Sequence, residues 1–134
     1  MTTFKSEKQT INVSSEKIFS FLADFNNFEK LMPEQVTNWQ STIDTCSFTI
    51  SGMVDLAMVM GEKSEHSFIS YKSASKKPFN FDLNTHISEE GGDKSVVEMV
   101  FNADLNPMLK MMASRPLQNL INMFGGKLKE IMEA

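Results

Sequence analysis

Residues 36–105 alternate apolar and polar side chains with a period of two, and this pattern constrains the fold more than any other feature of the chain. Such alternation is typical of strands that bury one face of a sheet. It predicts about six antiparallel strands, at 36–41, 45–51, 54–61, 65–72, 79–88 and 95–105. Turn-forming residues separate them at 43–44, Gly52, 61–62, 76–78 and 90–93. One face of the sheet is apolar and needs a cover.

The C-terminal segment is the predicted cover. Asn106 is suited to cap a helix and Pro107 to occupy its first position. Pro116 removes an amide donor, so we expect a kink or a restart near Ser114. The glycine pair at 125–126 predicts either a close approach to the sheet or a second weak point. Apolar residues recur in steps of three or four at Leu109, Met112, Pro116, Leu120, Phe124, Leu128 and Ile131.

The N-terminal part predicts a first strand followed by two short helices. Residues 10–13 alternate as a half-buried strand does, which brings the expected sheet to seven strands. Hydroxyl residues at 14–15 precede apolar residues at helical spacing as far as Phe25, the pattern of a capped amphipathic helix. Residues 28–32 form at most one more short helix, because Pro33 disfavours helical geometry at the residue before it.

Length and composition narrow the class of protein. A chain of 134 residues is long enough for one sizeable core, so we expect a single domain over 1–134. The net charge of −4 offers no basic footprint for nucleic acid, and the longest apolar run, 56–60, is too short for a membrane span. The N-terminus has no apolar signal segment and Cys46 has no partner for an internal disulfide, so the cytoplasm is the expected compartment.

The order of strand, two short helices, six strands and one long helix resembles the helix-grip fold of the SRPBCC superfamily, which includes START and birch-pollen-allergen proteins. The segments that carry the resemblance are VSSEKIF at 13–19, FLADFNN at 21–27, LMP at 31–33, CSFTI at 46–50 and NPML at 106–109. They look like small bacterial members labelled polyketide cyclase or dehydrase-like. The resemblance implies an α+β domain in which a curved seven-stranded antiparallel sheet wraps the C-terminal helix around a cavity for lipids, sterols, quinones or polyketides.

Side chains on the predicted inner faces of sheet and helix are the candidate lining of such a cavity. With eleven Met and eleven Phe in the chain, they either fill the space or surround a ligand. Trp39 is a candidate for the cavity mouth, since aromatic groups often line pockets. The candidates are Trp39, Phe48, Ile50, Met58, Met60, His66, Phe68, Phe81, Leu83, Met99, Phe101, Met112, Leu120 and Phe124.

The sequence does not decide which face of the strand predicted at 65–72 points into the core. Either Phe68 points inward, together with His66 and Ser70, or Ile69 does, together with Tyr71. The polar groups that would orient a ligand therefore come from His66, Ser70, Tyr71 or Thr85.

Non-covalent binding of a small hydrophobic molecule, as a carrier or sensor, is the function that we expect. One alternative is a cyclase or dehydratase that uses a titratable group in the cavity. Another is a regulatory module that binds a protein partner or a second copy of itself. We expect no cofactor and no metal, because two histidines on different strands without a nearby carboxylate do not form a metal site. The sequence also lacks the G-x-S-x-G motif of a serine nucleophile.

Overall fold

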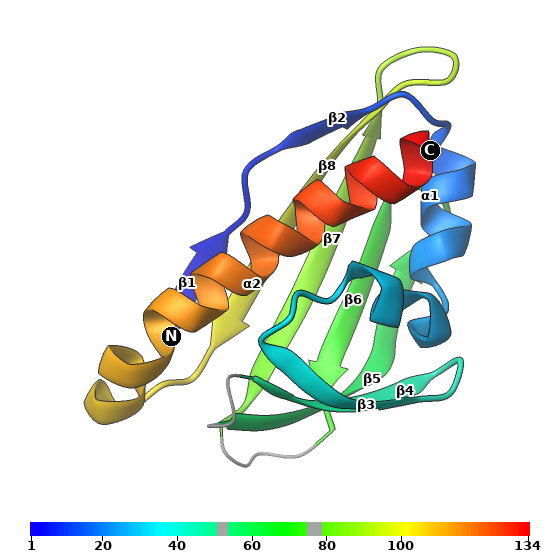
Figure 1. The fold of residues 1–134 in the computed structure, drawn as a ribbon. Coiled ribbons are helices and arrows are strands. Elements are labelled where there is room, and N and C mark those ends of the chain that lie inside the picture. The colour runs from blue at the N-terminus through cyan, green and yellow to red at the C-terminus, as the bar shows by residue number, and fades with distance from the viewer. Residues whose placement is uncertain (51–53, 75–78) are drawn as a thin grey trace.

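The protein is a single antiparallel sheet wrapped around its C-terminal helix (Figure 1). The computed structural model describes residues 1–50, 54–74 and 79–134, and within them eight strands follow the order β1-β8-β7-β6-β5-β4-β3, with β2 also paired to β8. The predicted α+β helix-grip class is confirmed. Residue 51 and the turns predicted at Gly52 and 76–78 lie outside the described residues. The strands are β1 (Thr2–Lys5), β2 (Gln9–Ile11), β3 (Val36–Ser41), β4 (Thr45–Ile50), β5 (Val54–Ser64), β6 (Phe68–Ser73), β7 (Phe81–Glu89) and β8 (Ser95–Ala103).

Two pieces of strand lie on the same edge of β8: β2, which corresponds to the strand predicted at 10–13, and β1, which the sequence did not predict. β1 pairs with residues 100–103 and β2 with residues 95–97. Ser6 lies between the pieces, where its amide donates to the carbonyl of Met99 and its hydroxyl accepts from the Met99 amide, each over 2.9 Å. β1 is therefore the eighth strand, beyond the seven that the sequence predicts.

Two short helices follow, as predicted. α1 (Ser15–Leu22) begins at Ser14, whose hydroxyl accepts a hydrogen bond from the amide of Lys17. η1 (Phe25–Leu31) is a 3-10 helix. Its buried residues, Phe25, Phe28 and Leu31, are spaced by three, which places them on one face of a helix with three residues per turn.

α2 (Pro107–Glu133) runs unbroken through Pro116, so the predicted restart near Ser114 is wrong. The Asn106 cap is confirmed, because its side chain accepts from the amide of Leu109 over 2.8 Å. The Ser114 hydroxyl donates to the carbonyl of Lys110 one turn earlier and caps no new helix. The buried stripe of α2 comprises Ala113, Leu117, Leu120, Ile121, Phe124, Gly125 and Leu128.

The hairpin between β5 and β6 differs from the prediction. The turn expected at 61–62 is an irregularity inside β5, and the strand continues to Ser64. The chain reverses at residues 65–67, where His66 has a φ of 61°. The first three residues of the strand predicted at 65–72 therefore belong to a turn, because the left-handed backbone at His66 cannot continue a strand.

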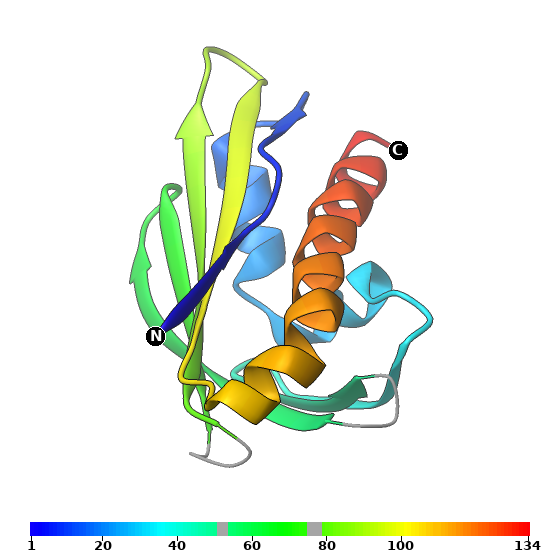
Figure 2. The ribbon, with the colours of Figure 1, turned by 90° about the vertical axis from the view of Figure 1, so that its left-hand side faces the viewer.

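The sheet is strongly curved, and its concave side holds all three helices. Figure 2 shows β3 and β4 curling beneath α2, while α1 and η1 lie on the same side of the sheet. The core lies between the two layers and includes fully buried residues from both, such as Leu22, Phe28, Tyr71 and Met99. No helix within the described ranges is long and apolar enough to cross a membrane.

Candidate functional site

The space between the sheet and α2 is almost completely filled. It contains an apolar cavity of about 20 Å³, and a cavity needs roughly 10–15 Å³ to hold one water molecule. The side chains around it come from four strands, from α2 and from the residue that follows η1. They are Met32, Phe48, Met58, Leu83, Phe101, Leu120, Ile121 and Phe124. In this closed form the phenylalanines and methionines of the two layers meet.

Carbon and sulfur are the only side-chain atoms that this lining presents. None of the eight side chains titrates near neutral pH, and none donates or accepts a strong hydrogen bond. General acid–base chemistry needs a titratable group within hydrogen-bond reach of the reacting atoms. The lining therefore offers only shape and apolar contacts, and it gives no support for the enzyme alternative.

The cavity lining includes six of the fourteen side chains predicted for it: Phe48, Met58, Leu83, Phe101, Leu120 and Phe124. Ile50, Phe81 and Met99 are buried in the surrounding core, and Met60 is half-buried against it. Sequence reasoning missed Met32 and Ile121. Ile121 adjoins Leu120 on a helical stripe that is two residues wide at this level, and Met32 is an apolar residue held extended before Pro33.

Three predicted lining residues lie elsewhere. His66 is in the β5–β6 turn, where its side chain is 41% exposed and its ring centroid is 5.7 Å from that of Phe19. Phe68 lies on the outer face of the sheet, 5.1 Å from the ring of His86, because Ile69 and Tyr71 take the inner face. Met112 is 53% exposed, because α2 packs on the sheet through the neighbouring Ala113.

Phe28 is the centre of an aromatic cluster that closes one side of the cavity. Its ring centroid lies 5.0 Å from Phe25, 5.1 Å from Tyr71 and 5.0 Å from Phe124, all in edge-to-face geometry. Such pairs contribute about 0.5–1.5 kcal/mol each beyond the burial of their surface. η1, which carries Phe28, is thereby fixed to both the sheet and α2.

Trp39 packs against this aromatic cluster. Its ring stacks on that of cavity-lining Phe48, with centroids 5.4 Å apart and planes 24° apart. The indole Nε1 donates to the Ser41 hydroxyl over 3.1 Å, and that hydroxyl donates to the side-chain oxygen of Asn26 over 2.7 Å. Trp39 is half-buried and therefore connects the cavity wall, the edge strand β3 and η1.

Two hydroxyl groups lie on the inner face close to the cavity. Tyr71 donates to the carbonyl of Leu22 over 2.8 Å, and burial raises the pKa of its phenol. Thr85 lies two residues along β7 from Leu83 and is fully buried. Its hydroxyl is close enough to the Tyr71 phenol to oppose part of that rise in pKa, but the two groups do not meet hydrogen-bonding geometry, and the Thr85 hydroxyl has no hydrogen-bonding partner among the described residues. The hydroxyl of Ser70 also lacks such a partner, but the alternation of β6 places it on the outer face.

Cys46 is a buried, unreactive thiol, as its place in an alternating strand predicts. Its side chain is 4% exposed. Burial raises the pKa of the thiol from 9.0 to about 12, although a hydrogen bond with the backbone of Met58 opposes the rise. The thiolate, which is the nucleophilic form, is therefore scarce at neutral pH.

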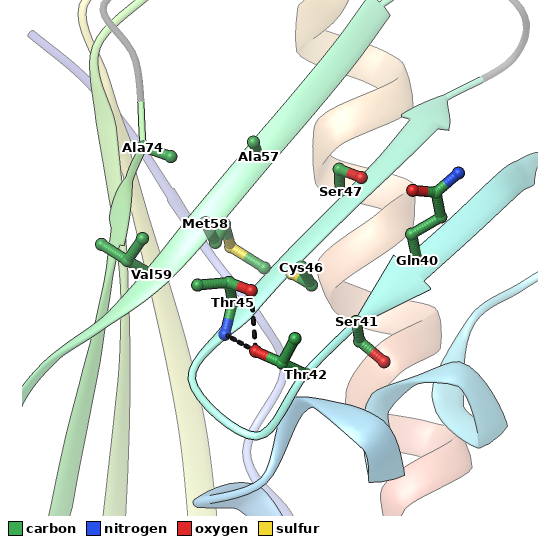
Figure 3. A pocket seen from close by; sticks show the side chains of 10 residues that line it. All are labelled: Gln40, Ser41, Thr42, Thr45, Cys46, Ser47, Ala57, Met58, Val59 and Ala74. Atoms are coloured by element: carbon green, nitrogen blue, oxygen red, sulfur yellow. Dashed lines mark hydrogen bonds between the residues drawn. The ribbon is translucent and has the colours of Figure 1, made fainter.

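A shallow groove of mixed polar and apolar lining lies on the opposite, outer face of β3, β4 and β5 (Figure 3). Its volume is about 380 Å³, and it is hollow because the facing residues Ser47 and Ala57 are small. At one end the hydroxyls of Thr42 and Thr45 bond to each other over 2.8 Å. These hydroxyls are exposed and satisfied, so the groove lacks the converging unpaired groups that mark a binding site. Among the described residues, no three His, Cys, Asp or Glu side chains are grouped to hold a metal.

Comparisons with known proteins place the fold. No protein-family model and no curated protein matches the sequence. Among solved structures, XoxI from Bacillus cereus superposes with a TM-score of 0.76 at 13% identity, over 98% of this chain and 96% of that one. A START superfamily protein from Mycobacterium smegmatis has a TM-score of 0.67 at 14% identity, over 96% and 98%. The Aha1 dimer from Colwellia psychrerythraea has a TM-score of 0.67 at 15% identity, over 99% and 97%.

These identities are too low to carry a function from one protein to another, but the structures match over nearly their whole lengths. The resemblance predicted from the order of elements is thereby confirmed at the level of architecture. The chain has the helix-grip fold of the START superfamily and of Aha1-like proteins.

Proposed function

We propose that the protein binds a small, largely apolar molecule between the sheet and α2, and that the core opens to admit it. The carrying observation is the enclosed cavity at that interface, lined only by apolar side chains. The START-type fold supports the proposal, since it places a curved sheet and a long helix around one interior space. Burial of the ligand's apolar surface would supply the binding free energy, at about 25 cal/mol per Å².

The cavity has to enlarge before it can hold such a molecule. Met32 and Met58 line it, and methionine adapts its unbranched side chain to irregular shapes more readily than other apolar residues do. η1 is the mobile element in this proposal, because a seven-residue 3-10 helix has weak internal hydrogen bonds. Displacement of η1 would withdraw Phe28 from Phe124 and open the cavity on the side of Met32.

The chemistry of the interior defines the class of ligand. An apolar lining excludes charged molecules, because burying an unpaired charge is strongly unfavourable. Thr85 lies on the same inner face of β7 as cavity-lining Leu83, two residues along the strand, and its buried hydroxyl makes no hydrogen bond among the described residues. An apolar ligand with one hydroxyl or carbonyl group at its end fits this arrangement, since that group would satisfy Thr85.

Trp39 provides the readout for a direct test. It is the single tryptophan of the chain and stacks on cavity-lining Phe48, so its fluorescence reports on the cavity wall. We would titrate the protein with a long-chain fatty alcohol, a sterol and a naphthoquinone, and record both Trp39 emission and thermal unfolding. A bound ligand should shift the emission and, at 100 times its Kd, stabilise the fold by about 2.7 kcal/mol.

The same titrations with a Thr85→Val variant serve as the matched control. Affinity for a ligand with a terminal hydroxyl should fall, while affinity for the corresponding hydrocarbon should stay the same. Failure of every apolar probe to change either signal, together with no copurifying molecule in native mass spectrometry, would contradict the proposal.

A further inference from the structure

The first three turns of α2 expose a group of methionines, which we call the methionine face: Met108, Met111 and Met112. Their side chains are 71%, 88% and 53% exposed. Folded proteins usually bury such residues, and contiguous exposed apolar surface is typical of an interaction site. Ala113 and Leu117 hold the opposite side of the same turns against the core, so the exposure does not result from an undocked helix.

The charge of α2 is opposite in sign to that of the rest of the protein. α2 (Pro107–Glu133) contains four basic and two acidic side chains, a charge of +2, and its first 23 residues contain no acid. Because the whole chain has a charge of −4, the residues outside α2 carry −6. Exposed Arg115 lies on the same side of α2 as the methionine face at 3.6 residues per turn, whereas exposed Lys110 lies on the other side of the first turn. Asp104, just before the helix, is an exposed acid close to them in sequence. A bipolar distribution of this kind orients the molecule with its basic helix toward an anionic surface.

The shape of this region distinguishes between partners. Figures 1 and 2 both place the first turns of α2 at one end of the molecule, far from the C-terminus. The methionine face is the outside of a helix and is therefore convex, so it can insert into a soft surface but cannot receive a peptide in a groove. A second copy docked through the same face would bring Arg115 of each chain close to Arg115 of the other, which like-charge repulsion disfavours.

We infer that the methionine face docks on the surface of an anionic lipid bilayer. The methionine side chains would enter the boundary between headgroups and acyl chains, and Arg115 would lie at the level of the lipid phosphates. This combination of an apolar face with flanking basic residues is what binds helices to membrane surfaces without spanning them. The inference stands on the exposed face and the charge of α2, and does not depend on a ligand in the core.

Vesicle flotation tests the inference with the full chain. The probes are phosphatidylcholine vesicles and vesicles of three parts phosphatidylcholine to one part phosphatidylglycerol, each at low and high salt. The protein should float with the phosphatidylglycerol vesicles at low salt, and at least about tenfold less with pure phosphatidylcholine or at high salt. Mild peroxide oxidation, read by mass spectrometry, should show that these vesicles protect Met108 and Met111.

Two variants assign the binding to this face. Met108→Ser combined with Met111→Ser should reduce flotation at least about tenfold while thermal unfolding stays unchanged, because both side chains are exposed. Ile43→Ser, which removes a 58% exposed side chain from the β3–β4 turn, should float as the natural sequence does. The inference is overturned if the natural chain does not float with phosphatidylglycerol vesicles or if the double variant floats equally well. It is also overturned if the double variant no longer dimerises, or no longer binds an acidic protein, and vesicles do not protect Met108 and Met111 from oxidation.

Discussion

The rings of Phe28 and Phe124 meet edge to face with their centroids 5.0 Å apart, and this contact joins η1 to the middle of α2. Phe124 lines the cavity, whereas Phe28 comes from a helix outside the sheet. The same two rings therefore complete the closed core and mark the place where it would have to open.

Replacement of Phe28 by leucine should test how much this contact holds the core together. The variant keeps an apolar side chain but loses edge-to-face contacts with three rings, so we expect the free energy of unfolding to fall by about 1–3 kcal/mol. Denaturant unfolding measures the change. Phe19→Leu is the matched control, since Phe19 is half-buried beside His66. This substitution should lower the free energy of unfolding by less than about 1 kcal/mol. Equal losses in the two variants would contradict a central role for Phe28.

Thr85→Val should leave the ligand-free protein as stable as before or make it more stable by about 1 kcal/mol. The substitution replaces an unpartnered buried hydroxyl by a methyl group of the same shape. Ser95→Ala is the control, because the Ser95 hydroxyl is also buried but donates to the carbonyl of Val13 and bonds to Ser15. Thermal unfolding should show a loss for Ser95→Ala alone. A clear loss for Thr85→Val would mean that its hydroxyl has a partner in the empty protein.

The protein should lose stability as the pH rises above 9. Unfolded Cys46 ionises near its ordinary pKa of 9.0, whereas the folded thiol, with a pKa of about 12, stays protonated. Its contribution is therefore complete below pH 9 and decreases between pH 9 and 12, by at most about 1.4 kcal/mol per pH unit. Tyr71 acts in the same direction above its own ordinary pKa of 10.0. Cys46→Ala should show a shallower decline in denaturant unfolding across this range, and an identical decline would contradict the assignment.

The glycine pair of α2 makes a further prediction. The expected close approach to the sheet is absent at Gly126, where an added Cβ would meet nothing within 4 Å, and Gly125 would meet only the side chain of Gln9 at 3.4 Å. Gly126→Ala should therefore stabilise the protein by up to about 1 kcal/mol through helix propensity. Gly61→Ala is the contrasting case, because its Cβ would lie 2.9 Å from the carbonyl oxygen of Ser70. Thermal unfolding should move in opposite directions for the two variants.

Much of the architecture could be predicted because periodicity reports directly on burial. The alternation in β4, β7 and β8 matches the buried faces observed there, and the Asn106 cap begins α2 as expected. The inner face of β6 could not be predicted, because apolar residues occupy both phases of its sequence. The irregularity between Met60 and Lys63 and the turn at His66 decide the phase, and both depend on contacts with the neighbouring strand.

The site was less predictable because periodicity assigns a residue to a face but gives no volume. Three consecutive residues, Met111, Met112 and Ala113, were compatible with the helical stripe, and the structure buries the smallest of them. The space between the sheet and α2 is also filled by Phe28, which enters the core from η1. The periodicity of the strands and of α2 cannot predict that contribution. Whether a cavity remains is decided by such contacts between distant segments.

Methyl NMR of the protein labelled at its methionine methyl groups tests most directly whether an apolar molecule enters the core. Met32 and Met58 line the cavity, whereas Met108 and Met111 are exposed at the far end of α2. On addition of a fatty alcohol, a sterol or a naphthoquinone below its aggregation limit, the Met32 and Met58 signals should shift and those of Met108 and Met111 should not. Signals of Met32 and Met58 that remain fixed with every probe, or shifts confined to the exposed methionines, would contradict binding in the core.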